Sequence, residues 1–168
     1  MAETDTAVKG ERQLVVFALA AEVYGLDIGT VREIIRMQDI THVPNAPDFV
    51  EGIINLRGKV IPVVDLRRRF GVSVAEQTRE SRIVVVDIRG EDIGLMVDAV
   101  TEVMRITGDA IEPASDLITT EDSYYIQGIA KLGDRLLILL DLDRVLSKEE
   151  RAALTQTKDP SAAKAGVA

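Results

Sequence analysis

The sequence repeats itself, and this repeat constrains the fold more than any other feature. Residues 13–36 align without a gap to residues 82–105, at an offset of 69, and eight of the 24 aligned pairs are identical. Residues 49–70 then align to residues 125–146, at an offset of 76. The matches include glycine and charged residues as well as apolar ones, so shared strand composition does not explain them. The chain therefore contains two copies of one unit.

Each copy has the sequence pattern of five short β-strands. The segments are rich in valine and isoleucine, and glycine or charged turn residues separate them. Such regular spacing favours a small closed barrel over an open sheet. Pro62 cannot donate a backbone hydrogen bond, which predicts that its strand lies at an edge or contains a bulge. The predicted strands of the first copy are LVVFALA, EVYGLDIG, REIIRM, FVEGIINL and KVIPVVDL, and those of the second are IVVVDIR, EDIGLMVD, TEVMRI, YIQGIAKL and RLLILLDL.

The predicted fold is all-β, with two tandem duplicated five-stranded barrels and a short C-terminal helix. The helix is expected over residues 147–154, where Ser147 is a suitable N-cap with glutamates in the first turn. The predicted boundaries are a disordered tail over 1–11, a first barrel over 12–80, a second barrel with the helix over 81–155, and a disordered tail over 156–168.

Residues that both copies share are expected to serve the fold. The glycines that repeat are predicted to sit where the backbone is tight or closely packed; they are Gly25 with Gly94 and Gly52 with Gly128. Asp65 and Asp141 each precede a helix-compatible stretch and are predicted to be helix N-caps. The alternative, that these two carboxylates are catalytic, is less favoured because a duplicated position more often supports the shared fold.

Composition excludes several classes of function. The chain has no cysteine, which excludes disulfides, thiolate zinc sites and cysteine nucleophiles. A net charge of −8 opposes general affinity for nucleic acid or anionic lipid. Residues 14–21 have the length of a signal-peptide core, but the flank before them is not positive, and no apolar run is long enough to span a membrane. These features predict a soluble intracellular protein.

The sequence contains no recognisable catalytic, cofactor or metal motif. His42 is the only histidine and lies in a proline-bounded loop, and no serine has a nucleophile-elbow context. No glycine-rich phosphate-binding motif occurs. The adjacent acids Glu91 and Asp92 are expected to lie on a solvated turn, and the basic cluster 67–69 on a solvated helical turn rather than against nucleic acid. We therefore expect no enzyme activity, no cofactor and no metal site.

Positions at which the copies differ are candidates for partner contacts. Arg57 lies in the turn NLRGK, which becomes KLGDR in the second copy, so that Gly133 takes its place. Arg57 is either a contact to a partner or a bridge between the two units, and the sequence alone leaves both possibilities open.

Several blocks in fixed order resemble the CheW family of bacterial chemotaxis coupling proteins. These are YGLDIGTVREI, then VPNAPDFVEGIINLRGKVIPVVDLRRRFG, then IGLMVDAVTEV, and the similarity extends from about residue 13 to residue 154. The resemblance implies two five-stranded SH3-like barrels with an apolar interface. It also implies a cytoplasmic, non-catalytic adaptor that links the tips of membrane-associated chemoreceptors to a chemotaxis histidine kinase, whose regulatory domain has a similar fold.

The resemblance also implies where partners bind. The LRG motif of the family falls on residues 56–58, with Arg57 in receptor coupling, and its VxEI block falls on Val31, Glu33 and Ile34. Val100 and Val103 are the matching apolar positions of the second copy and are predicted to line a groove between barrels that receives a receptor helix. The alternative for each valine is an ordinary core position.

Three other assignments are compatible with parts of this sequence. A regulatory domain cut from a larger kinase is less favoured, because Met1 and the polar tails favour an independent protein. A coupling protein fused to a receiver domain would need a longer chain. A related scaffold in a receptor–kinase pathway that does not control motility remains the alternative function.

Overall fold

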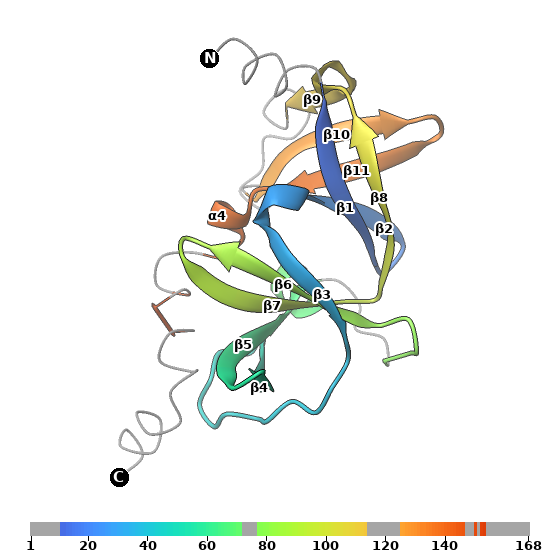
Figure 1. Cartoon of the computed structure of the whole chain (residues 1–168). Helices are drawn as coiled ribbons and strands as arrows, with labels where there is room; N and C mark the ends of the chain where they lie inside the picture. The colour runs from blue at the N-terminus through green and yellow to red at the C-terminus, as the bar shows by residue number, and fades with distance from the viewer. Residues whose placement is uncertain (1–10, 72–76, 114–124, 147–149, 151, 154–168) are drawn as a thin grey trace.

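The computed structural model describes residues 11–71, 77–113, 125–146, 150 and 152–153. Within these residues the chain is almost entirely β (Figure 1). The first copy provides five strands, namely β1 (Arg12–Leu19), β2 (Glu22–Asp27), β3 (Val31–Arg36), β4 (Val50–Leu56) and β5 (Lys59–Asp65). The second provides β6 (Arg82–Ile88), β7 (Glu91–Val97), β8 (Ala99–Ile106), β9 (Ile111–Pro113), β10 (Ile126–Leu132) and β11 (Arg135–Leu140).

The strands form two sheets that have the same internal order. Sheet A has the order β8-β1-β2-β11-β10-β9, and sheet B has the order β3-β6-β7-β5-β4. The sequence offsets pair β1 with β6, β2 with β7, β3 with β8, β4 with β10 and β5 with β11. Applying these pairs to sheet B reproduces the first five strands of sheet A. The two-barrel, all-β fold predicted from the repeat is therefore confirmed.

The division of the chain between the sheets differs from the predicted one. Each sheet combines strands of both copies, because the hairpin β1–β2 of the first copy lies in sheet A and the hairpin β6–β7 of the second lies in sheet B. β2 joins β11 through a parallel ladder, and β7 joins β5 in the same way. A cut between residues 80 and 81 would thus divide both sheets. The predicted boundaries of 12–80 and 81–155 follow the repeat but not the hydrogen-bonded units.

The chain passes between the sheets at two places. It leaves sheet A after β2 through a 3₁₀ turn, η1 (Ile28–Thr30), and enters β3. It returns from sheet B at Asp98, between β7 and β8. These two crossings occupy equivalent positions in the repeat, because the offset of 69 aligns Asp98 with Gly29.

Three apolar clusters form the core. Each barrel has its own interior, with Leu14 and Val16 in sheet A and the equivalent Ile83 and Val85 in sheet B. A larger third cluster lies between the sheets and takes buried side chains from both, including Phe17 of β1 and Val84 of β6. β1 and β6 are thus buried on both faces. This explains why their sequences are continuous apolar runs rather than the alternation of a strand with one face in water.

Pro62 does not lie on an edge strand, and the bulge in its ladder lies between Val50 and Gly52 of β4 rather than at Pro62, so neither predicted alternative holds. β5 lies between β4 and β7. Pro62 faces Ile53 of β4, and the ladder to β7 begins one residue later, at Val63. The proline is accommodated because it precedes that ladder and its missing N–H group interrupts no pairing with β7.

One short helix follows the last strand of each copy, at the predicted place. Asp65 precedes α2 (Leu66–Phe70) and its side chain accepts a hydrogen bond from the N–H of Arg67. Asp141 precedes α4 (Leu142–Val145) and accepts from the N–H of Asp143 in the same way. Residues 150, 152 and 153 are helical, while most of the predicted helix 147–154 and both predicted disordered tails lie outside the described residues apart from residue 11.

The four repeated glycines all lie where a side chain would meet a neighbour. A Cβ atom at Gly25 or Gly94 would contact a leucine or isoleucine side chain, and one at Gly128 would lie 2.9 Å from the carbonyl oxygen of Glu112. Gly52 is the tightest, since a Cβ atom there would lie 2.2 Å from the carbonyl oxygen of Thr41. Its φ of +153° also belongs to the region that other residues rarely adopt.

Candidate partner-binding surface

The residues predicted to bind partners gather mainly on two equivalent strands. β3 and β8 are the end strands of sheets B and A. Val31 of β3 and its repeat equivalent Val100 of β8 are half-buried, and both pack against the cluster between the sheets. Ile34 and its equivalent Val103 are among the few large apolar side chains that stay exposed, at 38% and 51%. We call these four residues the apolar face.

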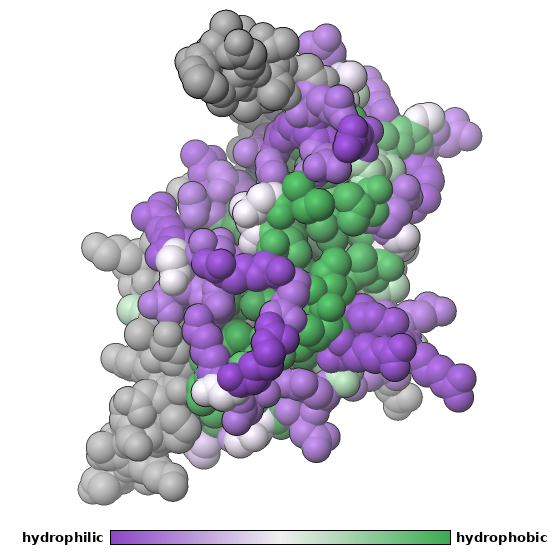
Figure 2. All heavy atoms as spheres, in the orientation of Figure 1, coloured by the Kyte–Doolittle hydropathy of each residue, from purple (hydrophilic) through white to green (hydrophobic). Residues whose placement is uncertain are grey.

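The apolar face is continuous with the core between the sheets. Val100 lies opposite Phe17 and Val103 opposite Val15 in the ladder that joins β8 to β1, and both β1 residues are buried. Figure 2 shows apolar side chains gathered over the region where β3, β1 and β8 lie in Figure 1, with hydrophilic groups around them. Contiguous apolar surface with a polar rim is typical of a protein-binding site.

Glu33, which precedes Ile34 of the apolar face in β3, forms an ion pair with Arg57. Glu33 lies on β3, and Arg57 lies in the turn between β4 and β5 at a φ of +52°. Because β3 and β4 are the two ends of sheet B, the pair joins opposite edges of the barrel. The hydrogen bond with Glu33 raises the pKa of the Arg57 guanidinium above its ordinary value, so it stays charged.

The ion pair with Glu33 bears on whether Arg57 bridges the two copies, one of the two possibilities that the sequence left open. Its described partner is Glu33 of the same copy and the same sheet, so Arg57 does not bridge the two copies through this contact. The side chain is 71% exposed, which leaves much of its surface available to a binding partner. The second copy has Gly133 at this position, so its equivalent glutamate, Glu102, has no counterpart of Arg57. The Glu33–Arg57 pair of β3 therefore has no equivalent at Glu102 of β8 among the described residues.

The expectation of a solvated turn at Asp92 was wrong. The Asp92 side chain is largely buried and pairs with Arg32 of β3 and with Lys59 of β5, whose Nζ lies 2.8 Å away. Burial raises the pKa of the Asp92 carboxyl, but hydrogen bonds from Lys59 and Arg32 outweigh this and leave its pKa below the ordinary value. The neighbouring positions of Glu91 and Asp92 in the sequence do not predict this pairing, because it depends on strands that only the fold brings together.

The expectation for the basic cluster 67–69 also needs correction. Arg67 is buried rather than solvated and pairs with Asp65 and Asp98. Arg68 is half-exposed and lies beside Asp65 and Glu51, while Arg69 pairs with Glu150. Each arginine thus has an acidic partner within the chain, which reduces the positive charge that this segment could offer to another molecule.

Outside the apolar face, the described surface offers a hollow and charged pairs. Within the described ranges, no group of three or more histidine, aspartate or glutamate side chains is placed to hold a metal ion, and no helix is long and apolar enough to cross a membrane. A hollow of about 440 Å³ opens beside Arg12, Asp27 and Gln127, but Arg12 already pairs with Asp27 and donates to Gln127. Apolar contact and charge pairing are what the apolar face and its rim can supply.

Comparison with known proteins supports the resemblance to the CheW family that the sequence motifs indicate. The sequence matches the CheW-like domain over residues 13–150. The chain belongs to the CheW family. It is 36% identical over 141 residues to a chemotaxis protein CheW of Klebsiella aerogenes, with 84% of this chain and 85% of that protein covered. A chemotaxis protein CheW of Treponema pallidum is 35% identical over 151 residues, with 86% and 88% covered.

A solved CheW structure has the same architecture. The chain resembles the crystal structure of the scaffolding protein TtCheW from Thermoanaerobacter tengcongensis, with a TM-score of 0.76 and 45% sequence identity. The match covers 83% of this chain and 94% of that one. The resemblance seen in the sequence motifs is thus confirmed for the family, and the fold and the general class of chemotaxis scaffold follow from it.

Proposed function

We propose that this protein is a non-catalytic chemotaxis adaptor that couples the cytoplasmic tips of chemoreceptors to a chemotaxis histidine kinase. Its membership of the CheW family and its relatives' names support the chemotaxis scaffold role in general. The particular partners, and recruitment to receptor arrays at the membrane, belong to the proposal. In it, the regulatory domain of the kinase and the hairpin tip of the receptor bind different surfaces of the two-barrel unit.

The apolar face carries this proposal. Val31, Ile34, Val100 and Val103 come from both sheets and remain exposed or half-exposed above a shared core. Leaving such surface in water costs free energy that a partner recovers when it covers the face. The apolar stripe of a receptor helix fits this chemistry, because side chains at helical spacing can lie between two end strands. Glu33 and Arg57 at the rim can then orient the helix by charge.

Coupling by such an adaptor requires a difference in binding free energy between signalling states. If the adaptor bound every receptor state equally, it would transmit nothing to the kinase. A small surface gives modest affinity for each contact, and repetition of the contacts across an array raises the overall affinity through effective concentration.

A titration against a receptor cytoplasmic fragment tests the proposal. Val103→Asp places a charge in the apolar face and should abolish or greatly weaken binding. Leu136→Asp is the matched control, because Leu136 is 53% exposed, close to the 51% of Val103, but lies on β11 outside the face. Equal binding of Val103→Asp and the parent protein, with unchanged circular dichroism, would remove the apolar face from the receptor site.

A further inference from the structure

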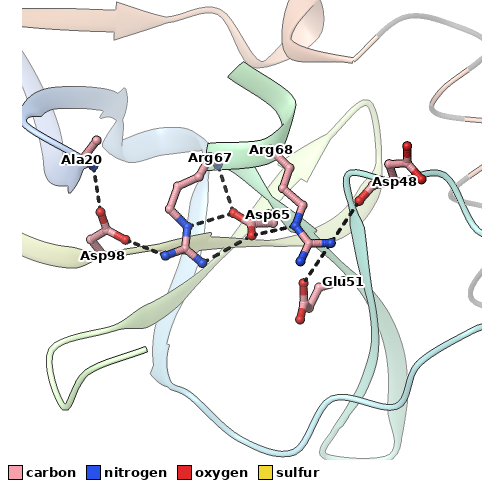
Figure 3. A network of polar contacts seen from close by, with 7 residues as sticks. All are labelled: Ala20, Asp48, Glu51, Asp65, Arg67, Arg68 and Asp98. Atoms are coloured by element: carbon pink, nitrogen blue, oxygen red, sulfur yellow. Dashed lines mark hydrogen bonds and ion pairs between the residues drawn. The ribbon is translucent and has the colours of Figure 1, made fainter. Parts of the chain in front are cut away.

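The two crossings between the sheets are equivalent in sequence but differ in how they are held. At the second crossing, Figure 3 shows the guanidinium of Arg67 between the carboxylates of Asp65 and Asp98. Its Nε and Nη2 lie 3.1 and 3.3 Å from the two oxygens of Asp65, and its Nη1 lies 3.1 Å from Oδ1 of Asp98. One side chain thus joins α2 to the residue at which the chain leaves sheet B.

The network continues into sheet A. The second oxygen of Asp98, Oδ2, accepts a hydrogen bond of 2.7 Å from the N–H of Ala20, in the turn between β1 and β2. The backbone N–H of Asp98 also donates to the carbonyl of Ala18. Arg67 and Asp65 are almost fully buried, so solvent and salt screen their interaction little. The second crossing is therefore connected to both sheets by a buried chain of polar contacts.

The first crossing has no such network among the described residues. The repeat offsets align Ala20 with Arg89, Asp98 with Gly29 and Arg67 with Asp143. Arg89 does pair with Asp143, at 3.6 Å, but both side chains are about 60% exposed. An exposed pair of this kind contributes little to rigidity. At the crossing itself the side-chain hydrogen bonds are local: the N–H of Gly29 donates to the Asp27 carboxylate, and the hydroxyl of Thr30 donates to the Asp27 carbonyl.

We propose that Arg67 fixes the relative orientation of the two sheets at the second crossing, at Asp98. The first crossing, at η1, is the flexible connection between the sheets. The two sheets then move relative to each other about the Asp98 crossing, which acts as the fixed point. β3 follows η1 directly, and β8 follows Asp98 directly. The separation of these two strands, which carry the apolar face, therefore depends on Arg67, although the bonds of Arg67 to Asp65 and Asp98 lie outside both strands.

The geometry makes this role specific to an arginine. The guanidinium presents a planar fork to Asp65 while a third nitrogen reaches Asp98. A lysine would keep the positive charge beside Asp65, but its single ammonium cannot hold both carboxylates in these positions. Asp98→Asn removes one charge from the network, keeps the side-chain size and leaves Asp65 paired with Arg67.

Distances between spin labels on the two sheets test the proposal in the full chain. The protein has no cysteine, so labels can be placed by substitution alone. Arg36→Cys on β3 and Arg135→Cys on β11 report on the separation of the sheets, and both positions are exposed. Gln13→Cys on β1 with Arg135→Cys reports on distances within sheet A, and serves as the control for the fold.

Arg67→Lys and Asp98→Asn should each broaden the inter-sheet distribution and leave the distribution within sheet A unchanged. Arg89→Met, which removes the exposed pair at the equivalent place, should change neither. The proposal is overturned if the inter-sheet distribution stays as narrow in both network variants as in the parent. It is also overturned if Arg89→Met broadens it equally, or if both distributions broaden together, because Arg67 would then be a general stabilising residue only.

Discussion

Substituting Gly52 by alanine should destabilise the protein far more than the same change at a neighbouring glycine. A Cβ atom at Gly52 would lie 2.2 Å from the carbonyl oxygen of Thr41, and the backbone cannot move away without breaking the Thr41–Ile53 pair of hydrogen bonds, at 2.8 and 2.9 Å. The forced φ costs about 1 to 3 kcal/mol. Each lost hydrogen bond adds about 1 kcal/mol. The expected loss in the free energy of unfolding is therefore about 3 to 5 kcal/mol.

Gly58→Ala is the matched control for this loss. Gly58 also has a positive φ, of +86°, but a Cβ atom there would meet nothing within 4 Å. Only the backbone conformation is penalised, at about 1 to 2 kcal/mol. In a chain of this size each kcal/mol lowers the melting temperature by about 2 to 4 °C. Gly52→Ala should therefore melt about 10 °C below the parent, and Gly58→Ala only a few degrees below it.

Chemical denaturation and amide exchange together check this prediction. Denaturation gives the two free energies of unfolding, and exchange reports whether the Thr41 and Ile53 amides lose protection in Gly52→Ala, as displacement of the bridge requires. Equal destabilisation by the two substitutions would refute the reasoning, because the close approach at Thr41 would then add nothing to the penalty of the backbone conformation.

Three further predictions follow from the charged residues. Arg57→Ala should keep the fold, as judged by circular dichroism, and weaken receptor-dependent kinase activation in reconstituted arrays, as should Glu33→Ala; unaltered activation would remove the pair from the coupling site. Arg67→Met removes the cation that bonds both oxygens of the buried Asp65 carboxylate and leaves it only Arg68, at 3.6 Å; it should cost about 3 to 5 kcal/mol in denaturant unfolding, whereas a loss below about 1 kcal/mol would mean that Arg68 or water compensates this carboxylate. Because the pKa of Asp92 is lowered in the folded state, the stability that this carboxylate provides is complete above its unfolded value of about 3.9 and is lost as the pH falls through the lower folded value. Asp92→Asn should flatten the dependence of stability on pH in that acidic range, and an unchanged slope would contradict the assignment.

The sequence predicted the strands and their duplication but not how the strands combine. Apolar runs, turn residues and the repeat identify ten of the eleven described strands and miss β9 (Ile111–Pro113), which is only three residues long and ends in a proline. However, the same strand order results whether each copy keeps its first hairpin or exchanges it with the other copy, so the repeat cannot distinguish these arrangements. The exchange depends on the parallel ladders β2–β11 and β7–β5, which join segments far apart in the sequence. The error in the domain boundaries has this cause.

Prediction of the surface residues was similarly uneven. The family motifs identified Val31, Ile34, Val100 and Val103, and the fold places them on end strands, although their binding role stays a prediction. The buried role of Arg67 was missed because three consecutive arginines suggest a solvated segment. One signal could have revealed it: Arg67 is replaced by Asp143 in the second copy, just as Arg57 is replaced by Gly133. Positions where the copies differ thus include structural residues as well as candidate partner contacts.

The most direct test of the adaptor role is a bridging experiment with three components. A receptor cytoplasmic fragment is fixed to vesicles, and the regulatory domain of the chemotaxis kinase is added with and without this protein. We predict that the kinase domain sediments with the vesicles only when this protein is present, and that Val103→Asp prevents this while Leu136→Asp leaves the receptor attachment intact. If the kinase domain sediments equally with and without this protein, or never sediments although each pair binds separately, the protein does not couple the two partners.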